Sequence, residues 1–158
     1  MAVTLLVQEY LRAGNVGYTV FQHVPAFTAQ EEAAVTHIPG RDWAKAVVCF
    51  ADGVPLMAVV PAHRHVDLER LLDITGAREL RLADESELAW LYPDCERGAM
   101  PPLGPLYRQR VFVDQSLAGE EEIVFNGGTH TDAICMQFCD YAALAHPVVG
   151  RFAERPPA

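Results

Sequence analysis

The chain has 158 residues, of which 51% are hydrophobic and 21% charged, and its formal net charge is −9. This composition is typical of one globular domain with a sizeable core, and it excludes an intrinsically disordered protein. A strongly acidic chain neutralises phosphates poorly, so we expect no broad nucleic-acid surface and no DNA partner. No apolar run reaches the ~20 residues that span a bilayer, and no basic signal region opens the chain, so we expect a cytoplasmic protein without a membrane partner.

The four cysteines form no recognisable metal or disulfide pattern. Cys49 and Cys135 lie within apolar runs, which is typical of buried thiols. Cys135 and Cys139 are the one close pair, and the second half of a zinc site is missing. We therefore expect no metal, no cofactor and no disulfide framework.

The N-terminal part predicts two helices around one strand. A helix over residues 4–13 ends at Gly14, because glycine tolerates the left-handed conformation that closes a helix. Alternation of apolar and polar residues over 18–23 predicts a strand. A capping-box pattern opens a second helix over 28–36.

The middle of the chain predicts a hairpin followed by alternating helices and strands. Strands over 43–50 and 55–60 are joined by Asp52-Gly53, a strong hairpin-turn signal. The elements expected after it are a helix over 67–75, a strand over 78–82 and a helix over 84–91.

Residues 98–106 combine glycines, prolines and apolar side chains without charge or periodicity. Because proline does not fit a central strand, this segment predicts a structured loop that packs on the body and shapes a pocket wall. The elements expected after it are strands over 107–114, 121–126 and 130–138, a helix over 140–145 and a frayed tail over 151–158. The whole order predicts an α/β (α+β) fold, with a curved mixed sheet and flanking helices in a single domain over 1–150.

Lys45 interrupts a predicted strand that is apolar on both faces. A lysine in a strand is usually an edge gatekeeper or a side chain that reaches out to solvent. A partly buried ammonium, however, needs a polar partner or an anionic ligand, and burial lowers its pKa. Lys45 is therefore a candidate for holding a phosphate or carbonyl oxygen, or for base chemistry.

The segment "FNGGTHTD" places two glycines between two predicted strands. The simplest interpretation is a Gly-Gly hairpin turn. The alternative is that Gly127 and Gly128 let backbone N–H groups approach a ligand, with Thr129 and His130 at the rim. The residues alone leave both interpretations open.

Other nucleophiles and metal ligands are weaker candidates. Neither serine of the chain lies in a Gly-x-Ser-x-Gly elbow, which argues against a serine triad. Cys49 shares a strand face with Lys45, so a cysteine nucleophile stays an alternative. His63 and His65 form a metal pair only if further ligands come from elsewhere. The residues thus predict a pocket formed by the 98–106 loop, Lys45 and the 127–130 turn, for an oxygen-rich or anionic ligand.

Five segments occur in an order that resembles a known family. They are "HVPAFTAQEEAA" (23–34), "AKAVVCFADG" (44–53), "AVVPAHRHVDLERL" (58–71), "GAMPPLG" (98–104) and "VFVDQSLAGEEEIVFNGGTH" (111–130). Together they resemble the YbaK/ProX family, the aminoacyl-tRNA deacylases related to the editing domain of bacterial prolyl-tRNA synthetase. The resemblance covers roughly residues 18 to 145.

The resemblance implies a metal-independent hydrolase that removes a mischarged amino acid from the 3′ end of tRNA. The lysine, the Gly-x-x-Pro loop and the Gly-x-His turn of the family fall on Lys45, on Gly98 to Pro101 and on Gly128 to His130. Its pocket-lining stretch falls on Pro25 to Ala29. The predicted catalytic residues are Lys45, Gly128, Thr129 and His130, and the predicted substrate-binding residues are Pro25, Phe27, Thr28, Gly98, Met100, Pro101 and Gly127.

The family suggests roles for these groups. Backbone N–H groups of residues 127–129 stabilise the oxyanion or grip the terminal adenosine. Lys45 holds the substrate carbonyl or a terminal phosphate as a fixed cation, and His130 orients the ribose or the water. Met100, Pro101 and Pro102 narrow the pocket to a small side chain, and alanine on proline tRNA is the first expected substrate.

The chain departs from the family pattern at three places in the predicted pocket. Ala46 stands where members have Thr, Ser or Asn, Met100 where they have Val, and residues 133–139 read "AICMQFC". These departures bear on the substrate more than on the reaction class. They also motivate an alternative, a non-catalytic module that binds a nucleotide, an amino acid or a tRNA synthetase surface. The expected partners are the 3′ end of an aminoacyl-tRNA and an aminoacyl-tRNA synthetase, and the sequence leaves open whether the synthetase delivers the substrate.

Overall fold

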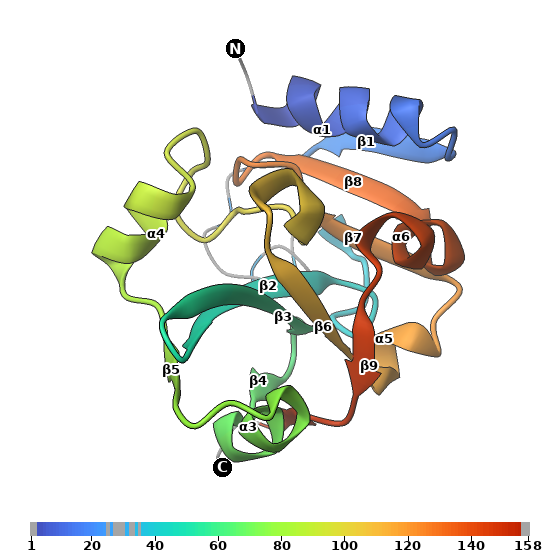
Figure 1. The fold of residues 1–158 in the computed structure, drawn as a ribbon. Helices are drawn as coiled ribbons and strands as arrows, with labels where there is room; N and C mark the ends of the chain where they lie inside the picture. The colour runs from blue at the N-terminus through green and yellow to red at the C-terminus, as the bar shows by residue number, and fades with distance from the viewer. Residues whose placement is uncertain (1–2, 25, 27–30, 32–33, 35, 156–158) are drawn as a thin grey trace.

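The computed structural model describes residues 3–24, 26, 31, 34 and 36–155, which form two larger sheets and a short two-stranded one (Figure 1). The elements are α1 (Val3–Ala13), β1 (Tyr18–Gln22), β2 (Ala44–Ala51), β3 (Val54–Pro61), β4 (His65–Val66), α3 (Leu68–Thr75), β5 (Leu80–Leu82), α4 (Glu85–Leu91), η1 (Gly104–Tyr107), β6 (Arg110–Asp114), α5 (Gln115–Ala118), β7 (Glu122–Asn126), β8 (Asp132–Gln137), α6 (Phe138–Ala145), β9 (Val148–Gly150) and β10 (Ala153–Glu154). The helix predicted over 28–36 falls largely outside the described residues.

The larger sheet has five strands in the order β5-β2-β3-β6-β9. β2 pairs antiparallel with β3 and β5, whereas β6 pairs parallel with β3 and β9. The sheet is therefore mixed, which confirms the predicted fold class. A second, antiparallel sheet has the order β1-β8-β7 and lies above the first in Figure 1.

The main hydrophobic core lies between the two sheets. Its buried side chains come from β2, β3 and β6 on one side and from β7 and β8 on the other, with α1 and α6 contributing. A second cluster covers the opposite face of the larger sheet, where Leu71 of α3 and Phe152 pack against β3. Burial on both faces explains why β2 and β3 read as nearly continuous apolar runs.

Local sequence signals set several element boundaries as predicted. Asp52 and Gly53 both have positive φ, 49° and 81°, as the β2–β3 turn requires. Asp67 caps α3 by accepting hydrogen bonds from two backbone amides, and Gly76 ends this helix at φ 71°.

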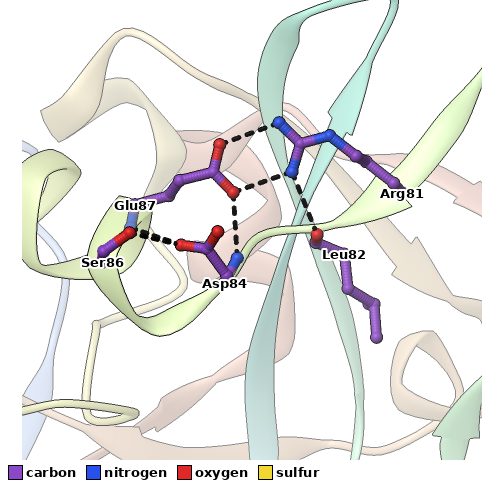
Figure 2. Close-up of polar contacts among 5 residues, drawn as sticks. All are labelled: Arg81, Leu82, Asp84, Ser86 and Glu87. Carbon is purple, nitrogen blue, oxygen red and sulfur yellow. Dashed lines mark hydrogen bonds and ion pairs between the residues drawn. The ribbon is translucent and has the colours of Figure 1, made fainter.

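Helix α4 is fixed to strand β5 by a small polar network (Figure 2). Asp84 and Glu87 form a reciprocal capping box, and Ser86 donates to Asp84 at 2.8 Å. The Glu87 carboxylate also accepts two hydrogen bonds from Arg81, at 2.7 and 2.8 Å. Hydrogen bonds from Arg81 and from the Asp84 amide lower the pKa of Glu87 to about 2. This network orients α4, which borders the loop of residues 92–103.

The C-terminal part differs from the predicted frayed tail. β9 pairs with β6, β10 pairs with β4, and Phe152 between them is fully buried. The ordered fold therefore continues through Glu154, and residues 156–158 lie outside the described part. The physical reason is Asp114, a buried carboxylate that accepts hydrogen bonds from the amides of Phe152 and Ala153.

Within the described residues, no helix has the length and hydrophobicity that crossing a membrane requires.

Candidate functional site

The turn between β7 and β8 is closed by its own side chains and amides. The Gly127 amide donates to the Asp132 carbonyl at 3.0 Å, and Gly128 has φ 105°, which favours glycine. The Thr129 hydroxyl donates to the Asp132 carboxylate at 2.7 Å and accepts from the Asp132 amide at 3.0 Å. The turn therefore has a defined shape, and the Thr129 side chain maintains it.

A second loop, residues 96–99, is bound to this turn by reciprocal hydrogen bonds. The Glu96 amide donates to the Gly128 carbonyl at 2.8 Å, and the Gly128 amide donates to the Ala99 carbonyl at 3.0 Å. The Glu96 carboxylate accepts from the His130 amide at 2.8 Å. We call this arrangement the loop clamp; it brings together two segments that lie more than 25 residues apart in the sequence.

The His130 ring completes the loop clamp from a buried position. Its Nε2 lies 2.6 Å from the Arg97 carbonyl oxygen. Because a carbonyl only accepts, Nε2 carries the proton and donates this bond. Gly98, at φ 82°, lies beside the ring: a Cβ added there would be 3.8 Å from Cε1 of His130. The predicted residues Gly98, Gly128, Thr129 and His130 are thus brought together.

Lys45 lies on β2 and is partly buried. Its ammonium donates to the Ala62 carbonyl at 3.4 Å, and burial lowers its pKa. It is the only lysine of the chain; the other eleven of the 12 lysine and arginine residues are arginines. A compact ammonium differs from a guanidinium in size and in how readily it loses its proton. The presence of a lysine at this position, in a chain that otherwise uses arginine, therefore favours a functional role for Lys45.

Ala46, the departure from the family pattern, faces away from Lys45. Its side chain packs against the main core, whereas the next residue, Val47, packs against the cluster on the opposite face. Since side chains alternate along a strand, Lys45 shares its face with Val47. The residue at position 46 therefore lies on the core side of β2.

The start of β2 lies beside β7, which relates Lys45 to the glycine turn. Trp43 and Val124 form a parallel bridge, and the Val124 amide donates to the Asp42 carbonyl at 2.9 Å. Lys45 lies two residues beyond Trp43, and Asn126 lies two residues beyond Val124, so both segments advance about 7 Å in the same direction. Lys45 and the Gly127-Gly128 turn thus follow the same bridge within a few residues on parallel segments.

Two predicted pocket residues lie in the core. Met100 and Pro101 are buried, and Met100 belongs to the main core cluster. Met100 also borders a cavity of about 130 Å³ beneath α4, whose lining includes Tyr92. The Tyr141 hydroxyl donates to the Pro102 carbonyl at 2.7 Å and holds this loop against α6. Contact of Met100 and Pro101 with the substrate stays a prediction. The same holds for Pro25, Phe27 and Thr28, which lie outside the described residues.

The alternative nucleophile and the alternative metal pair gain no support from their surroundings. Cys49 is fully buried, and burial raises the pKa of its thiol to about 12, which suppresses the reactive thiolate. His63 and His65 are exposed. In the described ranges, no three His, Cys, Asp or Glu side chains gather as metal ligands would.

Two residues that shape this site, Asp132 and Glu96, were not predicted from the sequence. Thr129 and Asp132 have the three-residue spacing of a hydroxyl–carboxylate turn motif, so a local signal for Asp132 existed. Glu96 lies just outside the Gly-Pro loop, and only its contact with a residue 34 positions away reveals its role.

Solved structures share this fold across nearly the whole chain. The hypothetical protein APE2540 matches with a TM-score of 0.84 and 20% identity over 94% of this chain and 99% of its own. A proposed trans-editing enzyme for prolyl tRNA synthetase matches with a TM-score of 0.81 and 22% identity over 98% of both chains. A proposed signal transduction protein from Marinobacter aquaeolei VT8 matches with a TM-score of 0.76 and 21% identity, over 94% of this chain and 30% of its own.

These identities are low, so the structural matches establish the fold. No curated protein sequence matches the chain significantly. The model of the aminoacyl-tRNA editing domain family matches residues 23–144, a range that includes Lys45 and the loop clamp. This match covers most of the chain and confirms the resemblance found in its motifs. The protein therefore belongs to the aminoacyl-tRNA editing domain family.

Proposed function

We propose that the protein is an aminoacyl-tRNA deacylase that hydrolyses the ester between a small amino acid and the 3′ end of a mischarged tRNA. The observation that carries the proposal is the position of the sole lysine, two residues beyond the bridge that joins β2 to β7, the strand that leads into the glycine turn, within the family match. Alanine on proline tRNA is the first candidate substrate. A structural neighbour is described as a trans-editing enzyme for prolyl tRNA synthetase, which supports that choice.

The ester is already activated, so the enzyme supplies positioning and charge stabilisation. The amides of Gly127 and Gly128 already donate to backbone carbonyls. The Thr129 amide, by contrast, donates none of the backbone hydrogen bonds found in the described part of the chain. We therefore assign the oxyanion contact to the Thr129 amide, a donor type whose loss typically costs about 3–4 kcal/mol of transition-state stabilisation.

Lys45 acts as a fixed cation. One N–H of its ammonium is used by the Ala62 carbonyl, which leaves the others for the substrate carbonyl or a terminal phosphate. His130 is a positioning residue, because its ring donates to the Arg97 carbonyl and keeps Thr129 in place. Water, assisted by the vicinal ribose hydroxyl, attacks the carbonyl carbon; the tetrahedral intermediate then collapses, and the ribose oxygen leaves as a hydroxyl.

The test is a single-turnover deacylation assay with a panel of correctly charged and mischarged tRNAs. We expect release of small amino acids, alanine from proline tRNA first, and loss of this activity in Lys45→Met. Arg12→Met is the matched control, because it also removes one positive charge but from the exposed side of α1. Circular dichroism checks that both variants fold.

Two outcomes would contradict the proposal. One is a panel in which every tRNA stays charged, with or without added prolyl-tRNA synthetase. The other is full activity in Lys45→Met. A free nucleotide or amino acid that stabilises the protein without any deacylation would favour a binding module instead.

A further inference from the structure

The turn after β3 carries a second cation beside Lys45. The Arg64 amide donates to the Pro61 carbonyl at 3.0 Å, so residues 61–64 form a β-turn. The carbonyl that accepts from the Lys45 ammonium belongs to Ala62, within the same turn. The Lys45 ammonium therefore contacts the same four-residue turn that carries Arg64, two positions before it.

Arg64 differs from the arginines that serve structural roles. Arg70, Arg81 and Arg97 each pair with a carboxylate, at 3.4, 2.7 and 3.0 Å. The Nε of Arg64 is buried, and among the described residues neither a hydrogen-bond acceptor nor a carboxylate lies against its guanidinium. In a chain with 21 acidic and 12 basic residues, a buried arginine Nε without a protein acceptor is open to an acceptor from a ligand.

The surroundings favour an anion. The segment from Ala58 to Val66 contains no acidic residue, and His63 and His65 flank Arg64. Lys45, across the strand pair from Val60, adds an ammonium whose only hydrogen-bond partner among the described residues is the Ala62 carbonyl. An ammonium that contacts a turn and a guanidinium carried by the same turn provide the two kinds of donor that bind phosphate oxygens.

We propose that Arg64 and Lys45 together bind the phosphodiester that precedes the terminal adenosine of the tRNA substrate. This assignment of the phosphate rests on the proposed function. Arg64 belongs to the turn after β3 and not to the loop clamp, so we assign it to substrate binding and not to the chemical step. Together, Arg64 and Lys45 form a local positive patch in an acidic protein. A small patch of this kind is what a contact limited to the 3′ end of the tRNA requires.

The binding test uses two probes, the dinucleotide cytidylyl-(3′,5′)-adenosine and adenosine, which lacks the phosphodiester. Titrations followed by NMR should show that the dinucleotide binds about tenfold more tightly, and that Arg64→Gln removes most of this difference. Arg64→Lys should retain part of it. Arg70→Gln, which changes an exposed arginine of α3, should leave both affinities unchanged.

The kinetic test separates binding from chemistry. We expect Arg64→Gln to raise KM for the aminoacyl-tRNA about tenfold with little change in kcat, and to reduce the salt dependence of binding by about one released ion. Equal affinity for the two probes, or identical behaviour of Arg64→Gln and Arg70→Gln, would overturn the phosphate site even if deacylation is observed. Arg64-dependent dinucleotide binding without deacylation would support the site and refute the proposed reaction.

Discussion

Replacing Asp114 should destabilise the fold far more than replacing an exposed carboxylate such as Asp73. The side chain is 4% exposed and accepts four hydrogen bonds. One oxygen accepts from the amides of Phe152 and Ala153, at 2.9 and 2.8 Å, and the other accepts from the amide and hydroxyl of Ser116, at 3.0 and 2.6 Å. Asp114→Ala removes all four acceptor contacts at once.

The expected loss follows from these contacts. Each of the two buried amides left without an acceptor costs about 1–3 kcal/mol, and loss of the helix cap costs about 1 kcal/mol more. The free energy of unfolding should fall by about 3–7 kcal/mol, a large part of the ~5–15 kcal/mol that is typical of a domain. Asp114→Asn keeps one acceptor oxygen, so its loss should be smaller.

Urea unfolding followed by circular dichroism measures this change. Asp73→Ala, which removes an exposed carboxylate of α3, is the control and should cost less than about 0.5 kcal/mol. A loss below about 1 kcal/mol for Asp114→Ala would contradict this prediction, because it would show that the two amides need no protein acceptor.

The pH dependence gives a second check on Asp114. Burial acts to raise its pKa, but the hydrogen bonds from Ser116, Phe152 and Ala153 outweigh burial and lower it. A lowered folded-state pKa means that the carboxylate stabilises the fold fully above its unfolded pKa of about 4. This stabilisation is lost as the pH falls below that value, so the difference between wild type and Asp114→Asn should shrink in acid.

Further predictions concern the site and its supports. Glu96→Ala should lower kcat about tenfold by releasing the His130 amide, whereas Glu96→Gln, which keeps an acceptor oxygen, should retain most activity. Cys49→Ala should keep full deacylation, and a loss of chemistry in a folded variant would revive the cysteine mechanism. An NMR titration should place the pKa of Glu87 near 2, and Arg81→Ala should raise it. Because the pKa of Lys45 is lowered by burial, enzyme-dependent deacylation should decline on the alkaline side at a lower pH than an ordinary lysine would give.

The elements that the sequence predicts well are those specified by nearby residues. The Asp52-Gly53 turn and the caps of α3 and α4 depend on contacts within a few positions, and the structure contains all of them. Strands β9 and β10 are different, because they exist through pairing with β6 and β4 far away in the sequence. Each has two or three residues, too few for a periodic pattern.

The same distinction holds for the candidate site. Lys45 and the glycine turn are visible in the sequence because a charge in an apolar strand and paired glycines are locally unusual. The loop clamp is invisible there, since Glu96 meets His130 only after folding. The sequence also cannot show that the Thr129 amide is available, because only the fold shows that the Gly127 and Gly128 amides donate to backbone carbonyls.

The presence of a single lysine has a practical consequence. Reductive methylation with ¹³C-formaldehyde modifies only the ε-amine of Lys45 and the α-amine of the N-terminus, and it preserves the positive charge at both. The Lys45 resonance is identified by its absence in Lys45→Arg. Its chemical shift would then report the protonation of the Lys45 amine and the binding of a phosphate beside it. This protein thus carries a spectroscopic reporter at its own candidate site, without any engineered label.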